Sequence, residues 1–169
     1  MGNESPECIV LNSSPIIALA AINLLEILIE LFPKIIVPPA VYEEVAVKGS
    51  GRPGSKELGD FVCQGKVKVL TPRDRPLVEA LHDPLGMGES EAIALAIEHN
   101  CIVILDDRIA RVKARSMRLN VKGTIGLLRL VYDKGLISKD KLVQALRELK
   151  EHGFRISSDI INEVLEKLE

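Results

Sequence analysis

Short apolar runs alternate with longer stretches of mixed polarity along this chain. Four short runs rich in branched apolar residues are typical of buried strands and cover residues 9–11, 34–37, 67–70 and 101–105. A stretch whose apolar residues recur at helical spacing follows each run. Strands that alternate with helices in this way form parallel sheets covered by helices on both faces. The sequence therefore predicts a three-layer α/β/α fold with a central, mostly parallel sheet.

Serine and proline residues beside the amphipathic stretches mark where helices begin. Ser13 or Ser14 is suited to cap the first helix, and Ser138 opens an amphipathic helix. The predicted helices are 16–22, 24–32, 41–47, 56–64, 77–82, 89–100, 108–119, 125–134, 138–151 and 159–168. Because we find no internal repeat and no long linker, we expect one domain over residues 9–137. Residues 1–8 are expected to be a flexible N-terminal segment, and residues 138–169 a helical extension of the same domain.

The core must be aliphatic, because aromatic residues make up 3% of the chain and apolar residues 47%. Buried parallel strands and packed helices are rich in such aliphatic residues. Lys and Arg number 22 against 24 for Asp and Glu, which gives a net charge of −2. This balance excludes a global attraction to nucleic acid, so that any basic surface has to be local.

The three cysteines, Cys8, Cys63 and Cys101, lack the spacing of a metal site and leave an odd thiol. We therefore expect all three to be reduced residues of a cytoplasmic protein. The apolar stretch 9–31 includes Asn12 and other polar residues, and it is too polar to span a membrane. No targeting segment is evident, which agrees with a cytoplasmic protein that does not bind membranes.

Acidic residues collect where predicted strands end and helices begin, above all within residues 86–111. One predicted helix opens with Glu89 and Glu91, and one predicted strand is followed by Asp106 and Asp107. Several carboxylates brought together repel each other unless a cation lies between them. The segment therefore raises the question of a metal site.

Two further segments bring polar groups to the same edge of the predicted sheet. Asn12 follows the first strand, and Glu43 and Glu44 come one helical turn after the second. Ligands of open parallel sheets bind outside the carboxyl ends of the strands. Oxygen ligands of this kind suit Mg²⁺ or Mn²⁺, which bind a phosphodiester and activate a water. The three histidines fit no zinc spacing.

Helical geometry separates the two glutamates that open the helix 89–100. Ile93 and Ala96 follow Glu89 at the spacing of one helix face, so Glu89 is expected to point inward. Glu91 lies on a different side and is expected to be exposed. Glu44 also shares a helix face with an apolar residue.

Each of these acids also has a purely structural explanation. Acids in a first helical turn stabilise the helix dipole, which applies to Glu89 and Glu91. Asp106 is placed to cap the following helix. Glu44 by itself fits a solvated helix face, and so does the basic run 108–118. Only the joint occurrence of the acids at the strand ends favours a metal site.

Five short motifs, taken in order along the chain, resemble a PIN domain: VLNSSPIIALA, IVPPAVYEEV, GMGESEAIALA, VILDDRIAR and VKGTIGLL. A G-E-x-E-A motif and the segment GFRIS before the last helix resemble the VapC-like branch of that family. The resemblance runs from about Ile9 to the C-terminus. It implies a metal-dependent ribonuclease for single-stranded RNA, in which acids from separate segments surround one or two Mg²⁺ or Mn²⁺ ions.

By motif, the acidic metal ligands of the family fall on Glu44, on Glu89 and on Asp106 or Asp107, while the first position falls on Asn12. These acids would also be the catalytic residues. Asn offers one neutral carbonyl oxygen where the family usually has a carboxylate, which weakens metal binding. A catalytically weak or inactive PIN-like module that binds RNA or a protein is therefore the alternative to an active nuclease.

The resemblance also implies supporting residues and partners. Ser13 or Ser14 would hold the site by hydrogen bonding, Thr124 would line it, and Arg108 or Arg111 would bind a phosphate of the substrate. Proteins of this branch are commonly toxins that form homodimers and pair with an antitoxin whose segment covers the acidic site. We therefore expect an RNA substrate, a homodimer and a cognate antitoxin protein.

Overall fold

A five-stranded parallel sheet forms the centre of the protein in a computed structural model that describes residues 7–168. The strand order is β3-β2-β1-β4-β5, and each neighbouring pair is parallel. The strands are β1 (Cys8–Leu11), β2 (Lys34–Val37), β3 (Lys68–Val69), β4 (Ile102–Ile104) and β5 (Val121–Lys122). The predicted parallel sheet is therefore confirmed, with β5 added at one edge.

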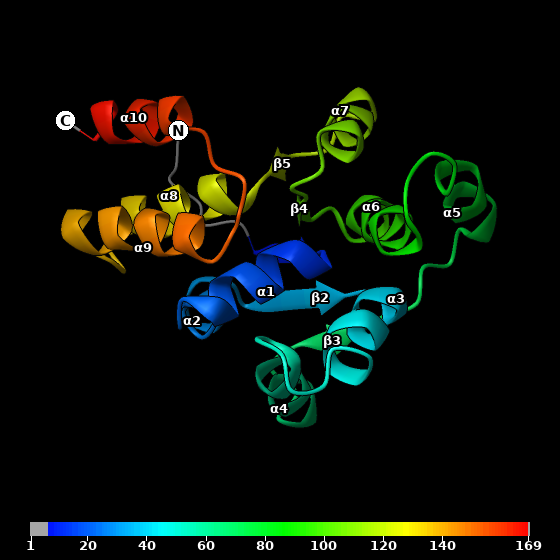
Figure 1. Ribbon diagram of the computed structural model, residues 1–169. Coiled ribbons are helices and arrows are strands. Elements are labelled where there is room, and N and C mark those ends of the chain that lie inside the picture. Colours follow the sequence, from blue (N-terminus) through cyan, green and yellow to red (C-terminus); the bar gives the residue numbers. More distant parts are fainter. Residues whose placement is uncertain (1–6, 169) are drawn as a thin grey trace.

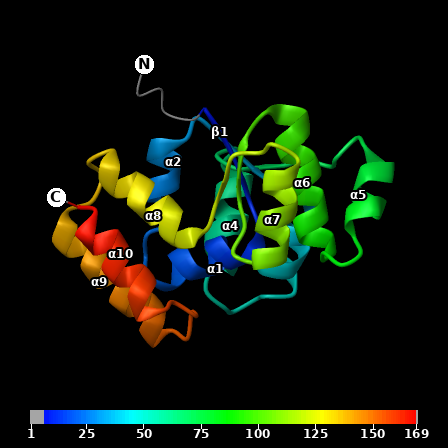
Figure 2. The same ribbon diagram turned by 90° about the horizontal axis from the view of Figure 1, so that it is seen from above.

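Helices cover both faces of the sheet, and α5 to α7 lie together, apart from α8 to α10 (Figures 1 and 2). The helices are α1 (Ser13–Ala21), α2 (Ile27–Leu31), α3 (Pro39–Tyr42), the π-helical turn η1 (Glu43–Val47), α4 (Ser55–Cys63), α5 (Arg75–Leu81), α6 (Met87–His99), α7 (Arg108–Ser116), α8 (Thr124–Asp133), α9 (Lys139–Glu151) and α10 (Ser158–Glu166). Alternate residues of β1 enter two separate cores. Ile9 and Leu11 pack with α1, α2, α4, α8 and α9, whereas Val10 packs with α6 and α7. The three-layer α/β/α prediction is thus confirmed.

The central strand β1 sets the register of its two neighbours in the sheet. Ile9 lies opposite Ile35 of β2 on one side and Ile102 of β4 on the other. All four residues of β1 are buried, which explains its unbroken apolar sequence. Because β1, β2 and β4 are parallel and in register, the segments that follow them leave the sheet at the same edge.

The helix boundaries differ from the prediction at places that matter for function. The first helix begins at Ser13 with Asn12 as its N-cap residue, so capping by Ser13 or Ser14 is wrong. The predicted helix 41–47 consists of the short α3 and the π-helical turn η1. Such turns are frequent at functional sites. The hydroxyls of both serines are consequently free to bond side chains of other segments.

The described residues include only part of the predicted N-terminal segment, and all but the last residue of the predicted C-terminal extension. Residues 1–6, most of the predicted flexible segment, lie outside the described residues, and β1 already begins at Cys8. In the predicted C-terminal extension, Leu142 and Leu146 of α9 pack in the same core as β1. Among residues 7–168, no helix is long and apolar enough to cross a membrane.

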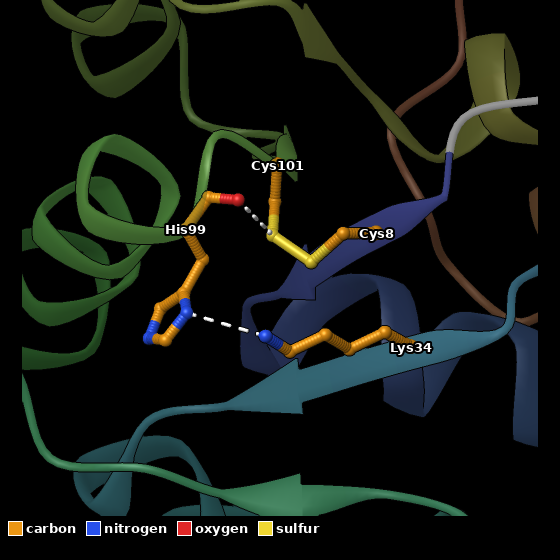
Figure 3. Close-up of a disulfide and its surroundings, with 4 residues drawn as sticks. All are labelled: Cys8, Lys34, His99 and Cys101. Carbon is orange, nitrogen blue, oxygen red and sulfur yellow. Dashed lines mark hydrogen bonds between the residues drawn. A yellow bond between two sulfur atoms is a disulfide. The ribbon is translucent and has the colours of Figure 1, made fainter.

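Cys8 and Cys101 form a disulfide at the amino ends of β1 and β4 (Figure 3). The prediction that all three cysteines are reduced is therefore wrong. The cysteines are 93 residues apart in sequence, but they stand one position before the paired residues Ile9 and Ile102. Parallel pairing thus brings together side chains that sequence spacing cannot relate. Since Cys63 alone is free and exposed, the cysteines carry no argument for a reducing compartment.

Lys34 and His99 lie beside the disulfide at this amino edge (Figure 3). The Nζ atom of Lys34 is 3.3 Å from Nδ1 of His99. Partial burial and the positive charge of Lys34 lower the pKa of His99 below its ordinary value of 6.5. The imidazole is therefore neutral at pH 7 and accepts a hydrogen bond from the lysine.

Removal of the disulfide is expected to destabilise the fold. The variant Cys8→Ser/Cys101→Ser should lose about 2–5 kcal/mol of unfolding free energy, because the bond closes a loop of 93 residues. Urea denaturation under oxidising conditions measures the loss, and Cys63→Ser is the matched control that should change little. A thiol titration of the unfolded, oxidised protein should find one thiol per chain. Three thiols would contradict the disulfide.

Candidate active site at the carboxyl edge of the sheet

Four segments meet at the carboxyl edge of the sheet. Asn12 follows β1, η1 follows β2 through the short α3, and Asp106 and Asp107 follow β4. The amino end of α6, with Glu89 in its first turn, completes the group. This is the edge at which open parallel sheets bind ligands.

The carboxylate of Asp106 joins the end of β4 to the first turns of α1 and α8. Its Oδ2 accepts hydrogen bonds from Ser14 Oγ at 2.9 Å and from Thr124 Oγ1 at 2.6 Å. Its Oδ1 accepts from the Thr124 amide at 2.7 Å. A Cβ atom at position 123 would lie 3.1 Å from Oδ1, so Gly123 lets α8 approach this closely. Both oxygens of Asp106 are therefore engaged by protein groups.

Glu44 is held by the serine next to Ser14. The hydroxyl of Ser13 donates to Glu44 Oε2 at 2.7 Å, although the two residues are 31 positions apart. Ser13 is buried and Glu44 is exposed, so the bond points the carboxylate back toward α1. The two adjacent serines thus hold one acid each, on opposite sides of the start of α1.

Glu89 lies close enough to two other acids for its ionisation to be affected. Burial is the main cause that raises the pKa of Glu89 above its ordinary value of 4.5, and the charges of Asp107 and Glu44 raise it further. A hydrogen bond from the Gly86 amide to Oε2, at 3.2 Å, acts in the opposite direction. The half-buried Glu89 is thus a carboxylate whose charge is disfavoured by the folded structure.

Three carboxylates share one pattern of hydrogen bonding. Glu44 and Glu89 each engage Oε2 alone, and Asp107 engages Oδ2 alone, accepting from the Ala110 amide at 2.9 Å as the N-cap of α7. Among the described residues, the second oxygen of each accepts no hydrogen bond from protein. The three acids therefore offer one free oxygen apiece, whereas Asp106 offers none.

A cavity of about 600 Å³ lies between α1, η1 and α6. It is lined by Asn12, Ser13, Ser14, Ala40, Glu43, Glu44, Lys48, Gly86, Met87, Gly88 and Glu89. Asn12 is 9% exposed, and a Cβ atom on Gly88 would lie 3.2 Å from its Oδ1. The missing side chain at Gly88 thus leaves room for the amide of Asn12 at the cavity wall.

A family model described as a PIN domain, DUF3368, matches residues 8–169 of the chain. The chain belongs to the PIN-domain family. Members of this family are nuclease-type domains, which accords with acids from several segments at one sheet edge. No curated protein matches the chain by sequence.

The donor atoms of this PIN domain fit a hard divalent cation in kind. Carboxylate and amide oxygens are the ligands that Mg²⁺ and Mn²⁺ prefer, and the repulsion felt by Glu89 is of the sort a cation relieves. Within residues 7–168, no group of three His, Cys, Asp or Glu side chains is already close enough to hold a metal ion. The free carboxylate oxygens would have to move together around the ion.

The prediction that Glu91 is exposed, which rested on the faces of one helix, is wrong. Glu91 is 6% exposed and accepts a hydrogen bond from the Ala40 amide at 3.1 Å. The carboxylate therefore caps the first turn of α3. Helix α6 lies inside the protein and is buried around most of its circumference, so it has no single inward face.

The predicted phosphate-binding arginines differ in their surroundings. One terminal nitrogen of Arg111 donates to the carbonyl oxygens of Asp106 and of Leu105. Arg108 is exposed at the start of α7, and its side chain makes no hydrogen bond or ion pair with the other described residues. The side chain of Arg111 is thus held against the backbone at the end of β4, whereas the side chain of Arg108 is free to reach a ligand.

Sequence reasoning missed Lys48, which lines the cavity between α1, η1 and α6. We call this space the acidic cavity. Lys48 follows the π-helical turn, and its amide bonds to Glu43 O at 2.8 Å, a spacing of five residues. A uniform α-helix would place Lys48 differently relative to Glu44. No helical pattern in the sequence signals this extra residue in the turn.

Glu89→Gln is expected to stabilise the metal-free protein by roughly 0.5 kcal/mol at pH 7, because it removes a half-buried charge and its repulsion from Asp107 and Glu44. The pKa of Glu89 is raised on folding, so the native state takes up this proton at higher pH than the unfolded chain. The difference between the variant and the natural protein should therefore be largest above the raised pKa. It should vanish as the pH falls below 4.5. Urea denaturation from pH 8 to pH 4 measures this difference in stability, and Glu79→Gln is the control at an exposed glutamate. Destabilisation by Glu89→Gln at pH 7 would contradict an unfavourable charge at Glu89.

Asp106 and Asp107 are expected to differ in what they contribute to stability. Asp106→Asn should cost roughly 1–3 kcal/mol, because the amide cannot replace an acceptor of three hydrogen bonds. Asp107→Asn should change stability by less than about 0.5 kcal/mol, since Asn caps helices as well as Asp. Thermal and urea unfolding of the two variants test this, and equal losses would contradict the different roles.

Proposed function

We propose that this PIN domain is a divalent-metal-dependent endoribonuclease that hydrolyses phosphodiester bonds in single-stranded RNA. The observation that carries the proposal is the free oxygen on each of Glu44, Glu89 and Asp107. These acids influence one another, since the charges of Glu44 and Asp107 raise the pKa of Glu89. A fold gains no stability from such a group of acids, but a cation bound among them would.

The residues of the site take distinct roles in this proposal. Glu44, Glu89 and Asp107 hold Mg²⁺ or Mn²⁺ through their free oxygens, with the Asn12 amide oxygen as a neutral ligand. Asp106 is a positioning residue, because both of its carboxylate oxygens accept hydrogen bonds from Ser14 or Thr124. Asp107 is therefore preferred to Asp106 as the aspartate that holds the ion. Bound there, the ion would supply positive charge against the scissile phosphate and lower the pKa of a water.

The protein groups around the acids orient the substrate. Arg108 adjoins Asp107 and is exposed, so its guanidinium can bind a phosphate oxygen of the RNA. Lys48 lines the acidic cavity and offers a second positively charged side chain.

The resemblance to the VapC-like branch supports the role of a toxin in a toxin–antitoxin pair. The motif that begins at Gly88 falls at the start of α6, where Glu89 and Glu91 have their contacts with Gly86 and Ala40. By the same resemblance, we propose a homodimer and an antitoxin whose segment covers the acidic cavity. A positively charged side chain of such a segment would be attracted by the free oxygens of the site.

The alternative is a PIN-like module that binds RNA or a protein but cuts slowly or not at all. Asn12 favours it, because a buried neutral amide stands where the family usually has an acid. The same observation allows a weaker but sufficient site, since Asn12 faces the cavity that Glu44 and Glu89 line. Metal affinity and cleavage separate the two functions.

Purified protein with Mn²⁺ is expected to cut labelled single-stranded RNA, and EDTA should abolish the reaction. Glu89→Gln and Asp107→Asn should each lower kcat at least about 100-fold by replacing a charged carboxylate ligand of the ion with a neutral amide. The same variants should lose the rise in Tm that Mn²⁺ gives to the natural protein, whereas Glu79→Gln should keep both properties.

The control for the alternative function is Asn12→Asp. An active natural protein predicts little gain in cleavage from this change. If Mn²⁺ stabilises the natural protein but no RNA is cut, and Asn12→Asp restores cleavage, the natural chain is a binding module. A natural protein that neither binds Mn²⁺ nor cuts RNA contradicts the proposed function.

A further inference from the structure

A second cavity, of about 720 Å³, adjoins the acidic one. Ser14 lines both cavities, and the wall of the second comes from α7, the start of α8, the segment before α10 and α10 itself. Three of its lining residues are arginines: Arg111, Arg115 and Arg155. Figure 2 shows α10 beside α9, on the side of the sheet that carries α8. We call this space the arginine cavity.

The arginines of the arginine cavity outnumber its acidic residues. Its two acidic lining residues are Asp106 and Glu163. Asp106 is engaged by Ser14 and Thr124, and Glu163 forms an ion pair with Lys167 at 2.6 Å. Within residues 7–168, neither Arg115 nor Arg155 forms an ion pair. The cavity therefore presents cations to any anion that enters it.

The arginines are arranged so that their donors remain available. Arg111 uses one terminal nitrogen on two backbone carbonyls, and its other guanidinium nitrogens make no hydrogen bond with described residues. Arg115 and Arg155 come from segments far apart in sequence and are both exposed. Guanidinium groups approaching from two sides suit a phosphate, which accepts several hydrogen bonds. The amides of Ile125 and Gly126, in the first turn of α8, add donors without helical acceptors to the same wall.

An aromatic and apolar surface completes the cavity. Phe154 is half-buried, and Ile156 and Ile160 lie beside it in the lining. An aromatic ring next to guanidinium groups is the combination that binds an unpaired base together with its phosphate. Because the whole chain carries a net charge of −2, attraction for a polyanion has to come from a local site of this kind. A base-paired duplex would not offer its base faces to Phe154.

We propose that the arginine cavity binds a nucleotide of single-stranded RNA that flanks the bond to be cut, with its phosphate on Arg115 and Arg155 and its base against Phe154. The proposal rests on the proposed function, since the shared wall at Ser14 connects the cavity to the acidic site. A strand that crosses Ser14 would have one phosphodiester among the acids and its neighbour among the arginines.

The first test measures RNA binding without cleavage. Fluorescence anisotropy with a labelled single-stranded oligonucleotide in EDTA should show at least about tenfold weaker binding for Arg115→Ala/Arg155→Ala. The slope of log K against log salt should shrink by about 1.4, for two phosphate contacts at roughly 0.7 each. The control variant Arg75→Ala/Arg147→Ala removes two exposed arginines that do not line the cavity and should keep the natural affinity and slope. If the double variant misfolds, the single variant Arg155→Glu is measured instead. It should raise the Kd for the oligonucleotide by at least about threefold, which is one arginine's share of the tenfold loss.

The second test concerns the base. Phe154→Leu keeps an apolar side chain but removes the ring, and should weaken binding of the natural oligonucleotide roughly 5- to 100-fold. An oligonucleotide with an abasic site at the flanking position should lose affinity for the natural protein and show no further loss with Phe154→Leu. Equal losses on both oligonucleotides would overturn the base contact.

The outcomes separate this proposal from the nuclease itself. If the natural protein cuts RNA and Arg115→Ala/Arg155→Ala raises KM while kcat and the Mn²⁺-dependent rise in Tm stay unchanged, both proposals hold. If no RNA is cut but the binding loss and the altered salt slope are seen, the cavity binds RNA and the nuclease proposal fails. If the double variant binds RNA as the natural protein does, the arginine cavity is not an RNA site, whatever the cleavage result.

Discussion

The carboxylate of Asp106 is the contact on which the geometry of the site depends. It receives the Ser14 hydroxyl from α1 and both the amide and the hydroxyl of Thr124 from α8. Because charge-assisted hydrogen bonds in a partly buried place are strong, the ends of β1 and β4 and the start of α8 are held as one unit. The adjacent Ser13 extends this unit to Glu44 after β2. Asp106 thus fixes the start of α1, from which Ser13 holds Glu44 at the cavity, while both of its own oxygens are engaged by protein groups.

The same edge of the sheet is a place where the fold tolerates unfavourable charge. Glu89 is partly buried near Asp107 and Glu44, and its bond from the Gly86 amide offsets only part of the resulting penalty. A helix of the same length with a neutral residue at this position would be better for stability alone. The arginines of the neighbouring cavity are likewise left without acidic partners. Stretches of opposite and uncompensated charge therefore lie side by side across Ser14, a pattern suited to an extended polyanion and a cation together.

The sequence was sufficient to predict the sheet, the layers and the segments that carry the acids, because buried strands and capped helices leave local patterns. Glu91 and the disulfide show where local patterns fail. The burial of Glu91 depends on α3 packing against α6, and the disulfide of Cys8 depends on which strand pairs with β1. Likewise, the sequence left Asp106 and Asp107 equivalent, and only their hydrogen-bond partners distinguish them. These outcomes come from contacts between segments far apart in the chain, which no periodicity within one segment can reveal.

The disulfide has a consequence for the opposite end of the strands that it joins. β1 and β4 leave the Cys8–Cys101 bond side by side, and after a few residues each they deliver Asn12 and the aspartate pair. A slip of one strand past the other by one residue would shift these groups by about 3.3 Å and turn every side chain to the other face. The covalent bond forbids that slip. The disulfide at the amino edge of the sheet therefore fixes the register of β1 and β4. This register keeps Asn12 and the aspartate pair level with each other at the carboxyl edge.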